Sequence, residues 1–390
     1  MTQSTVLHVI DSLNVGGAQQ LLVLLAKYNP PGRRMAVCVL QPDLEIAGRI
    51  EAHGVPVHPL GRLRPSVTSP FRFLAYVLGS LRDIARLKKK LGADIVHGHL
   101  SDAEFLSILA GRATGARKVT ITFHTPQLLP ERRGGGLRNR LRVLAMRLIY
   151  RRADAVVAVS AEILDALREV VGIDPARLVH IPNGVDCLAL GGVECDALAS
   201  RRAPEALRHE LGLGADDTVL LNVGRLTAQK GQMHLIEALA ALSRDHPRLK
   251  LLLAGDGPDR GELSAAIARL GLGGRAVLLG SRGDIADLLA LADVVVVSSL
   301  WEGTSLSMME AMAAGKTMAV TDIPGNRELL EDGVDALMFP PADTAAMARA
   351  LDRLLADRVL AGRLALAARA KAKERFDIQR VAAAYEALWK

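Results

Sequence analysis

From end to end, the chain alternates short apolar runs with longer amphipathic stretches. The short runs, of which Thr5–Ile10 and Val294–Val297 are typical, are apolar at consecutive positions instead of at every second one. Consecutive apolar residues are typical of parallel strands that are buried on both faces. Because parallel strands must be joined by crossovers, which are usually helices, the alternation predicts βαβ units and doubly wound α/β sheets.

The alternation occurs twice. The expected strands are Thr5–Ile10, Met35–Leu40, Val55–His58, Ile95–His97, Val119–Phe123 and Ala155–Val159 in the first half, and Val219–Val223, Leu249–Ala254, Val277–Leu279, Val294–Val297, Thr317–Val320 and Ala336–Met338 in the second. The stretch from Val359 to Lys390 is helical in pattern throughout. We therefore expect two similar Rossmann-like domains that face each other across a cleft, because open α/β sheets bind ligands at the carboxyl ends of their strands. The expected divisions are a domain over 1–185, a linker over 186–217, a domain over 218–372 and a last helix over 373–390 that packs back toward the first domain.

Composition excludes several classes of function. The chain has 390 residues and 41.6 kDa, which is enough for two domains. Aromatic residues make up only 3%, which argues against a surface that stacks rings on sugars or on single-stranded nucleic acid. Cys38, Cys187 and Cys195 form neither a disulfide framework nor a zinc spacing, which favours a reducing cytoplasm. No apolar run reaches the ~20 residues of a membrane span, and the N-terminus lacks the positive start of a signal peptide.

The net charge of +7 is unevenly spread. Residues 1–185 contain 25 Lys and Arg against 14 Asp and Glu, a net of +11, whereas 186–390 contain 24 against 28, a net of −4. Eight of the basic residues lie within 62–90 and eight within 131–152, with one acidic residue in each stretch. Anionic lipid attracts each nearby cation by ~1 kcal/mol, so we expect an anionic membrane surface to be a partner of the first half. The alternative is that an Arg-rich chain uses Arg only for solubility.

Two candidate segments follow strands of the first half. Gly16 and Gly17 stand between a strand and a helix, where bare backbone and a helix N-terminus can approach an anion. His124 follows the fifth expected strand, from where an imidazole can reach a ligand hydroxyl. A tight loop and a structural histidine are the alternatives. The other histidines near strands are interpreted as one core residue and two candidates for lining the acceptor side: His8, His97 and His99.

The second half offers a pair of cations and a glycine-rich turn. Arg225 and Lys230 lie five residues apart, between a strand and the start of the next helix. Two cations beside a helix N-terminus suit a diphosphate. Gly255, Gly257 and Gly261 resemble a dinucleotide-binding fingerprint, but the spacing is one residue too long, so the turn is weak evidence for NAD.

The most specific segment follows the strand Val294–Val297. Glu302 lies in the loop after this strand, and Glu310 lies on the helix that the loop opens. The residues between them, 303–306, would direct backbone N–H groups at an anion. Two carboxylates beside an anion site suit a ligand that carries hydroxyl groups on both sides of a diphosphate. Such a ligand is a nucleotide sugar.

In this order, these segments resemble glycosyltransferase family 4, the retaining enzymes of the GT-B fold, over nearly the whole chain. The most specific parts of the resemblance are the E-x7-E pair, Glu302 and Glu310, and the junction Ile181-Pro182-Asn183-Gly184-Val185-Asp186. One departure is visible after the first strand, where many members read Gly-Gly-x-Glu and this chain has Gln19. The departure bears on the acceptor side and leaves the use of the donor unaffected.

The resemblance implies a role for each matching residue. Arg225 and Lys230 would neutralise the diphosphate of the donor, and Glu310 would hold the ribose hydroxyls. Glu302 would hold hydroxyls of the transferred sugar. The other implied contacts are His124 near the bond being broken, Gly16, Gly17 and Gly257 along the donor, Ser281 and Arg282 at the base, the backbone of Gly303, Thr304, Ser305 and Leu306 at the phosphates, and Asn183 at the hinge.

The resemblance also implies the reaction. A sugar passes with retention from a UDP-sugar, or from a GDP-sugar such as GDP-mannose, to a glycan or lipid-linked acceptor in polysaccharide or glycolipid biosynthesis. The chain has no D-x-D motif, so we expect no metal and no other cofactor, and fixed cations and helix N–H groups would stabilise the leaving diphosphate. The donor phosphate would itself accept the proton of the acceptor, so no protein general base is assigned. The expected location is cytoplasmic, with attachment to the inner face of the membrane.

Three alternatives share some of these features. Another GT-B enzyme, such as a nucleotide-sugar epimerase or a glycosyl phosphorylase, differs in needing no acceptor or in needing free phosphate. An NAD-dependent oxidoreductase is disfavoured by the glycine spacing and by the lack of a ribose-binding carboxylate after the second strand. A nucleic-acid-binding module is disfavoured by the scarcity of aromatic residues and by the intact set of site residues.

Overall fold

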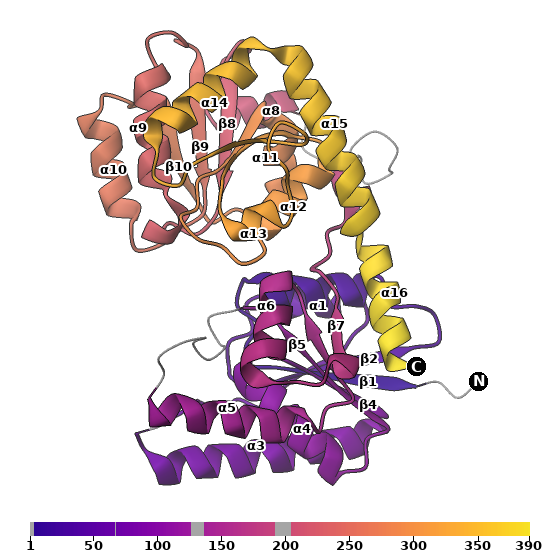
Figure 1. The fold of residues 1–390 in the computed structure, drawn as a ribbon. Helices are drawn as coiled ribbons and strands as arrows, with labels where there is room; N and C mark the ends of the chain where they lie inside the picture. Colours follow the sequence, from indigo (N-terminus) through magenta and orange to yellow (C-terminus); the bar gives the residue numbers. More distant parts are fainter. Residues whose placement is uncertain (1–3, 67, 126–135, 192–203) are drawn as a thin grey trace. The chain divides into compact units, whose positions relative to one another are not determined.

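The computed structural model describes residues 4–66, 68–125, 136–191 and 204–390, and its contacts divide the chain into two units (Figure 1). The first unit comprises Met1–Gly184 with Ile378–Lys390, and the second comprises Val185–Asp377. Several residues considered above lie outside the described residues: the first three of the chain, the part of the basic stretch over 131–135, and Cys195.

The first unit is built on a seven-stranded parallel sheet with the order β3-β2-β1-β4-β5-β6-β7. Its strands are β1 (Thr5–Ile10), β2 (Arg34–Val39), β3 (Val57–Pro59), β4 (Ile95–His99), β5 (Lys118–Phe123), β6 (Ala155–Ala158) and β7 (Leu178–His180). Its helices are α1 (Gly17–Lys27), α2 (Ala47–Glu51), α3 (Pro70–Leu91), α4 (Ser101–Ala113), α5 (Leu137–Tyr150), α6 (Ala161–Ala166), which continues as a π-turn over Leu167–Val171, and α16 (Ile378–Trp389). The strand order reverses between β1 and β4.

The second unit repeats this plan on a six-stranded parallel sheet with the order β10-β9-β8-β11-β12-β13. Its strands are β8 (Thr218–Val223), β9 (Leu249–Ala254), β10 (Ala276–Gly280), β11 (Val294–Val297), β12 (Thr317–Thr321) and β13 (Leu337–Phe339). Its helices are α7 (Cys187–Leu190), α8 (Pro204–Glu210), α9 (Gln232–Leu242), α10 (Arg260–Arg269), α11 (Ile285–Leu291), α12 (Leu306–Ala313), α13 (Pro324–Arg327), α14 (Thr344–Ala356) and α15 (Arg358–Arg375). Here the order reverses between β8 and β11.

Local sequence accounts for these elements. Every residue of β11 is buried, because helices cover both faces of a doubly wound sheet. Side-chain caps set where helices begin: the Asp343 carboxylate accepts from Ala346 N at 2.8 Å and the Asp357 carboxylate accepts from Leu360 N at 2.9 Å. Gly92, at φ +60°, ends α3 in the left-handed region that favours glycine. The two predicted Rossmann-like sheets are confirmed.

The predicted unbroken helix over Val359–Lys390 is wrong at one point. α15 ends at Arg375 and α16 begins at Ile378, because the backbone at Phe376 and Asp377 pairs with another segment. Val185 N donates to Phe376 O at 2.9 Å, and Val185 forms a parallel bridge with Asp377. The chain thus leaves the first unit after residue 184 and returns to it after residue 377, at two points that are joined by hydrogen bonding.

The last helix is part of the core of the first unit. Tyr385 and Trp389 of α16 are buried among residues of β1, β2 and α1. Two pairs of hydrogen bonds hold the helix in place: Arg33 contacts the Glu386 carboxylate at 2.6 and 3.0 Å, and Arg117 donates to the carbonyls of Trp389 and Lys390 at 2.8 and 2.7 Å. Within the described residues, no helix is both long and apolar enough to cross a bilayer.

Candidate functional site

Three of the predicted site residues of the second unit lie after β8 and β11, the two strands between which the order of the sheet reverses. Arg225 and Lys230 follow β8, and Glu302 follows β11. β8 and β11 are neighbours in the sheet, so loops that lie 72 residues apart in sequence meet at its carboxyl edge. Ligands of open α/β sheets bind at this kind of reversal point.

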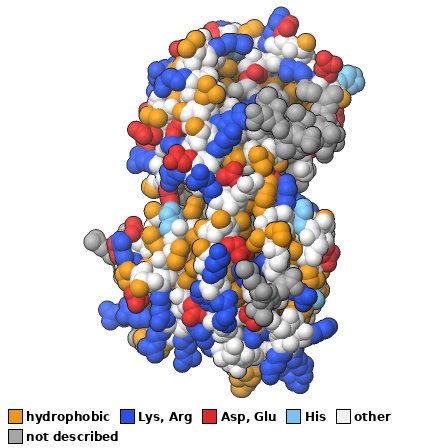
Figure 2. All heavy atoms as spheres, turned by 90° about the vertical axis from the view of Figure 1, so that its right-hand side faces the viewer, with side chains coloured by type: hydrophobic (Ala, Val, Ile, Leu, Met, Phe, Trp, Pro, Cys, Tyr) orange, Lys and Arg blue, Asp and Glu red, His pale blue; other side chains and the backbone are white. Residues whose placement is uncertain are grey.

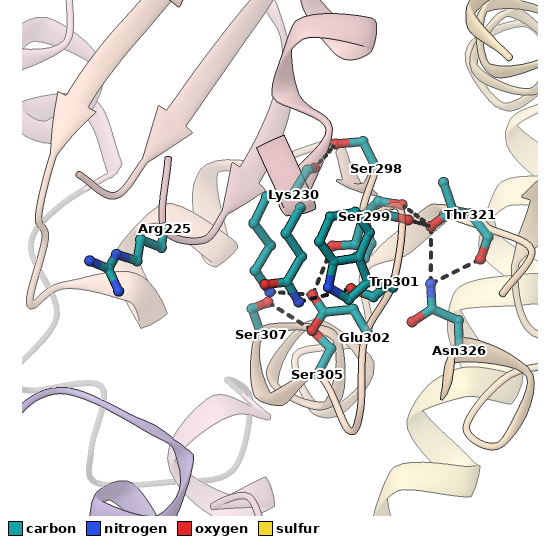
Figure 3. A network of polar contacts seen from close by, with 12 residues as sticks. Arg225, Lys230, Ser298, Ser299, Trp301, Glu302, Ser305, Ser307, Thr321 and Asn326 are labelled. Carbon is teal, nitrogen blue, oxygen red and sulfur yellow. Dashed lines mark hydrogen bonds and ion pairs between the residues drawn. The ribbon is translucent and has the colours of Figure 1, made fainter. Parts of the chain in front are cut away.

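An ion pair between Lys230 and Glu302 is the centre of this site (Figure 3). Lys230 Nζ contacts Glu302 Oε1, and the Ser299 hydroxyl donates to the same oxygen at 2.7 Å. The side chains are only 21% and 8% exposed, respectively, so both charges are largely withdrawn from water. A buried pair of this kind holds its two groups ready for a ligand that offers an anion to one and hydroxyl groups to the other.

Polar contacts with the backbone hold the loop that carries Glu302. The Gln229 amide donates to Trp301 O at 2.9 Å, and Leu300 N donates to Gln229 O at 2.7 Å. On the other side of the loop, the Thr321 hydroxyl donates to Ser299 O at 2.7 Å. Figure 3 shows these contacts on both sides of the loop. The carboxylate is therefore positioned by the neighbouring segments and not by its own loop alone.

Arg225 is not part of the ion pair. Its side chain is exposed and has no ion pair among the described residues, and Figure 3 shows it pointing away from Lys230. The structure therefore brings Lys230 and Glu302 together and leaves the Arg225 guanidinium accessible to an anion from solvent.

The N-terminal end of α12 lies in the same loop. α12 begins at Leu306, and Ser305 precedes it without capping the helix through its side chain. Met309 N, which donates to Ser305 O at 3.2 Å, makes the first bond of the helix, so the preceding N–H groups have no partner within it. These N–H groups and the helix dipole favour an anion at this end. Glu310 lies about one turn further along the same helix and is half-buried.

Two glycines allow the loops to approach this closely. Gly231 has φ +63°, and a Cβ there would lie 2.2 Å from Ser298 O. A Cβ on Gly257 would lie 2.2 Å from Leu226 O. The glycine-rich turn after β9 therefore serves at least to pack the loops after β8 and β9 against each other.

The Arg282 side chain, predicted to lie near the base, is bound to two carboxylates. It contacts Asp284 at 2.5 Å and Glu210 at 3.0 Å. The hydrogen bonds that Arg282 donates to Asp284 raise the pKa of the guanidinium above its ordinary value. The guanidinium is therefore engaged within the protein, and the Gly280 carbonyl accepts from Gly255 N at 2.8 Å.

In the first unit, Gly16 precedes α1 and Gly17 is its first residue. Gln19, which replaces the glutamate of many family members, is buried, and its amide donates to Ser12 O at 3.2 Å. A carboxylate could not donate this bond. Gln19 thus braces the loop between β1 and α1.

His124 is the outer member of a chain of three imidazoles. His8 Nδ1 lies 2.9 Å from His99 Nε2, and His99 Nδ1 lies 3.1 Å from His124 Nε2. His8 and His99 are fully buried, whereas His124, just after β5, is half-buried. The prediction that His8 is a core residue is confirmed, and the prediction that His99 lines a surface is wrong, because β4 carries its side chain into the interior.

His97, the other predicted lining residue, is also fully buried. The Trp389 N–H donates to its Nδ1 at 3.1 Å, and its Nε2 lies 2.8 Å from the Thr122 hydroxyl. Trp389 can only donate, so His97 carries its proton on Nε2. His97 therefore joins β4 to the last helix, and its side chain is withdrawn from the surface that it was predicted to line.

Burial keeps these imidazoles uncharged. It lowers the pKa of His8 and of His124 to about 3, and it lowers the pKa of His97 and His99 well below the ordinary value. Desolvation is the main cause, because moving a cation out of water is unfavourable.

An acidic group in the first unit was not predicted from the sequence. The Asp11 carboxylate accepts from Ala103 N at 2.8 Å and so caps α4. Burial, reinforced by the neighbouring charge of Asp102, raises its pKa to about 7. Glu104, one turn into α4, is buried, and desolvation raises its pKa well above the ordinary value. The only sequence sign of this group is the Asp that follows β1.

Asn183 is buried one residue before the first crossing between the units, and its Oδ1 has no hydrogen-bond partner among the described residues. Among the described residues, no group of three or more His, Cys, Asp or Glu side chains is placed so that it could hold a metal ion.

Comparison with known sequences gives matches in both units. The model of "Glycosyl transferases group 1" matches residues 204–375, and that of "Glycosyltransferase Family 4" matches residues 15–187. An alpha-D-kanosaminyltransferase of Streptomyces kanamyceticus is 31% identical over 83% of this chain and 84% of its own length. The UDP-Gal:alpha-D-GlcNAc-diphosphoundecaprenol alpha-1,3-galactosyltransferase of Escherichia coli is 30% identical over 72% of this chain and 71% of its own length.

Solved structures match the fold of the whole chain. A glycosyltransferase from Rickettsia africae ESF-5 has a TM-score of 0.83 at 22% identity, over 100% of this chain and 98% of its own. The Anabaena protein Alr3699/HepE, crystallised in complex with UDP, has a TM-score of 0.79 at 24% identity, over 99% of each chain.

Proposed function

This chain belongs to the glycosyl transferases group 1 and glycosyltransferase family 4, and from that premise we propose that it transfers a sugar with retention of configuration and without a metal ion. The chain is a glycosyltransferase of the GT-B fold that uses a nucleotide sugar. In the proposal, the donor is a UDP- or GDP-sugar and the acceptor is a glycan or is lipid-linked. The E. coli relative is named for a UDP donor and a lipid diphosphate acceptor, and the Anabaena protein was crystallised with UDP. Both support this choice.

The observation that carries the proposal is the Lys230–Glu302 ion pair beside the N-terminal end of α12. When a nucleotide sugar binds, its diphosphate takes Glu302's place as the partner of Lys230. The Glu302 carboxylate, still held by Ser299, then accepts hydrogen bonds from sugar hydroxyls. Each hydrogen bond to a charged group contributes ~1.5–3 kcal/mol, so the exchange replaces one buried contact with several.

In the transfer step, the diphosphate gains negative charge as the sugar leaves. Lys230, Arg225 and the first N–H groups of α12 stabilise that charge, because they are in place before the reaction begins. Glu310 holds the ribose, and His124 contacts the transferred sugar. The donor phosphate accepts the proton of the acceptor on the face from which the sugar departs, which gives retention.

The base of the nucleotide is recognised by backbone. Gly280 ends β10 and Ser281 follows it, while the Arg282 side chain is held by Asp284 and Glu210. Backbone groups can pair with either base, and the UDP named for the E. coli and Anabaena proteins leads us to expect that UDP-sugars bind more tightly than GDP-sugars.

A thermal-shift screen over UDP- and GDP-sugars tests the donor, because a ligand that binds only the folded state raises the melting temperature. We expect UDP-sugars to give the larger shift. Incubating the best donor with candidate acceptors and determining the anomeric configuration of the product then tests retention. Inversion of configuration, or full activity that depends on an added divalent ion after chelation, would contradict the proposed mechanism.

We also propose an anionic membrane surface as a partner of the first unit. α3 exposes Phe71, Leu74 and Leu78 by 86, 54 and 57%. α5 repeats the spacing and exposes Leu141, Leu144 and Leu148 by 57, 50 and 42%. Both helices pack against α4. Exposed apolar rows of this size are unusual on a soluble surface and indicate an interface.

The charges beside these rows favour a lipid surface over a protein partner. α3 contains six basic residues and one acidic residue, and α5 contains basic residues and no acidic one. Figure 2 shows Lys and Arg side chains gathered at the lower end of the first unit, where Figure 1 draws these helices. Apolar side chains flanked by Lys and Arg are typical of helices that lie in the plane of a membrane surface.

Binding to vesicles tests this partner. We expect the protein to sediment with phosphatidylglycerol vesicles but not with phosphatidylcholine vesicles, and to release as salt is raised. Leu74→Gln and Leu144→Gln should each weaken binding about tenfold, since burying a Leu contributes ~1.5–3 kcal/mol. Leu366→Gln on α15, where Leu366 is 70% exposed, is the matched control. Equal binding to both lipids, or an equal effect of the control, would overturn the proposal.

A further inference from the structure

The turn that joins β12 to α13, residues 321–326, packs against the loop that carries Glu302. Thr321 ends β12 and Asn326 lies in α13, and both residues are fully buried. The Thr321 hydroxyl donates to Ser299 O at 2.7 Å, and the Ser299 hydroxyl donates to Glu302 Oε1 at 2.7 Å. Figure 3 draws Thr321 and Asn326 on one side of the loop and Lys230 on the other. Hydrogen bonds through Ser299 thus join the end of β12 to the carboxylate.

Asn326 decides which way the Thr321 hydroxyl points. Its Nδ2 donates to Thr321 O at 2.9 Å and to Thr321 Oγ1 at 3.2 Å. A carbonyl can only accept, so the nitrogen of the Asn326 amide faces residue 321 and its oxygen does not. The Thr321 hydroxyl therefore accepts from Asn326, and its single proton is left for a carbonyl of the next segment. Ser299 O, at 2.7 Å, is nearer than Val297 O, at 3.3 Å.

Gly325 brings the same turn against the backbone of the loop. A Cβ on Gly325 would lie 2.4 Å from Glu302 O and 2.4 Å from Gly303 O, which is closer than real Cβ atoms come to other heavy atoms. Both neighbours are backbone atoms, which cannot rotate away as the end of a side chain can. Any side chain at position 325 must therefore displace either the loop or the turn.

This support matters most after a ligand has bound. In the unliganded protein, Glu302 Oε1 is held by both Lys230 Nζ and the Ser299 hydroxyl. In the proposed exchange, the diphosphate takes Lys230 from the carboxylate, and the Ser299 hydroxyl keeps hold of it. The carboxylate is then placed only as accurately as Ser299 is, and Ser299 is held by Thr321.

We propose that Thr321, Gly325 and Asn326 are positioning residues, which hold the loop so that the Glu302 carboxylate meets the hydroxyl groups of the transferred sugar. They act through Ser299 and through the backbone of Glu302, and they need no contact of their own with the ligand. The effect on sugar transfer rests on the proposed function, whereas the position of the loop does not.

The position of the loop can be read without a ligand by ¹⁹F NMR of protein labelled with 5-fluorotryptophan. The chain has two tryptophans and gives two signals, which are assigned by the loss of one in Trp301→Phe. Trp301 lies next to Glu302 in the loop. Trp389 lies in the first unit, so its signal is an internal control for changes that spread through the whole protein.

Three variants should shift or broaden the Trp301 signal and leave the Trp389 signal unchanged. Thr321→Val removes the hydroxyl at constant shape, Asn326→Asp cannot donate to Thr321 O while ionised, and Gly325→Ala adds the clashing Cβ. Thr321→Ser, which keeps the hydroxyl, should leave both signals in place. So should Gly362→Ala on α15, where a Cβ meets nothing within 4 Å. An unchanged Trp301 signal in Thr321→Val and Gly325→Ala would overturn the proposal, whether or not any sugar is transferred.

Kinetics with the best donor tests the consequence for the reaction. A misplacement of about 1 Å can cost about 100-fold, so kcat should fall at least about tenfold in Thr321→Val and Gly325→Ala. It should fall less than about twofold in Thr321→Ser and Gly362→Ala. Equal losses in Thr321→Val and Thr321→Ser would contradict the proposal. Melting curves of each variant check that it folds.

A double variant shows whether the effect passes through the carboxylate. In Glu302→Gln, which has already lost the charge that the turn positions, adding Thr321→Val should cost less than about threefold further. Losses that multiply in full would contradict the proposal. Full transfer by Glu302→Gln alone would instead contradict the proposed function, and the ¹⁹F signals would still decide whether the turn holds the loop.

Discussion

The two units share one topology but place different chemistry at the same edge of the sheet. In each, the strand order reverses beside the first strand of the unit. In the second unit, Lys230 and Glu302 follow the two strands on either side of that reversal, whereas His124 of the first unit follows β5, one strand beyond β4. The first unit offers His124, the outer end of a neutral chain of imidazoles. The second offers the charged pair of Lys230 and Glu302.

Burial differs between the two sets of polar groups. His8 and His99 of the first unit are carried by strands, so they lie inside and burial keeps them uncharged. Lys230 and Glu302 of the second unit are carried by loops beyond the strand ends, where they form an ion pair. We therefore expect changes in the second unit to affect binding of the diphosphate most strongly, and changes in the first unit to affect orientation and pH-dependent stability.

The largest effect is expected from Glu302→Gln. Transfer should fall at least about 100-fold, because a charged acceptor of sugar hydroxyls is lost. Affinity for UDP, which lacks the transferred sugar, should stay unchanged or rise, because Lys230 no longer has a competing carboxylate. Steady-state kinetics and UDP titration measure the two quantities. Glu262→Gln, on the exposed side of α10, is the control. A parallel loss of UDP affinity would show that Glu302 does not exchange partners.

Glu310→Ala should have the next largest effect. Removing an ionised acceptor from two ribose hydroxyls should lower transfer at least about tenfold with the fold intact. A donor with a 2′-deoxyribose tests the contact itself. It should lose activity relative to the normal donor with the wild-type enzyme, but not with Glu310→Ala. An unchanged rate would remove Glu310 from the site.

The first unit should be destabilised by acid. His8 and His124 have a folded pKa of about 3, below the ~6.5 of an unfolded histidine, so unfolding takes up protons. The stabilisation is complete above about pH 6.5 and is lost as the pH falls toward 3. Asp11, whose pKa is raised to about 7, has the opposite effect, because its protonated form is favoured in the folded state.

The two tryptophans allow the pH dependence of the first unit's stability to be measured, because Trp389 lies in the first unit and Trp301 in the second. In Trp301→Phe, the fluorescence of Trp389 follows the first unit during urea unfolding. The midpoint should fall between pH 7 and pH 5, and it should fall more steeply when Asp11→Asn is added. A midpoint that does not change with pH would contradict the neutral imidazoles.

The smallest effect is expected from Gln19→Glu, which restores the residue of many family members. It removes the bond to Ser12 O and should cost about 1 kcal/mol of stability in the first unit. UDP affinity should change less than threefold. A tenfold change in UDP affinity would indicate that Gln19 contacts the donor instead of only stabilising the loop between β1 and α1.

The sheets were largely predictable, because the runs Leu249–Ala254 and Val294–Val297 are apolar except for Lys250 and form strands with those bounds. The three-residue strand β7 was missed, since so short a run has no period. The break at Phe376 was also missed, because it depends on pairing with Val185, which lies 191 residues earlier in the chain. Local pattern carries no information about such distant partners.

The residues of the site could be predicted from the sequence, but the contacts between them could not. The motifs identified Lys230 and Glu302 separately, while their contact depends on β8 and β11 being neighbours. The imidazole chain was not predicted, although one sign was available: histidines occur in or just after three strands that are neighbours in the sheet. Which way each ring points is decided by packing, which the spacing does not reveal.

We propose that the donor diphosphate binds at Lys230, and calorimetric titration of UDP measures the affinity of this contact. We expect the wild-type protein to bind UDP and Lys230→Met to bind it at least about 100-fold more weakly, while Lys250→Met, at the opposite end of β9, binds it normally. Equal affinity of wild type and Lys230→Met would contradict the account.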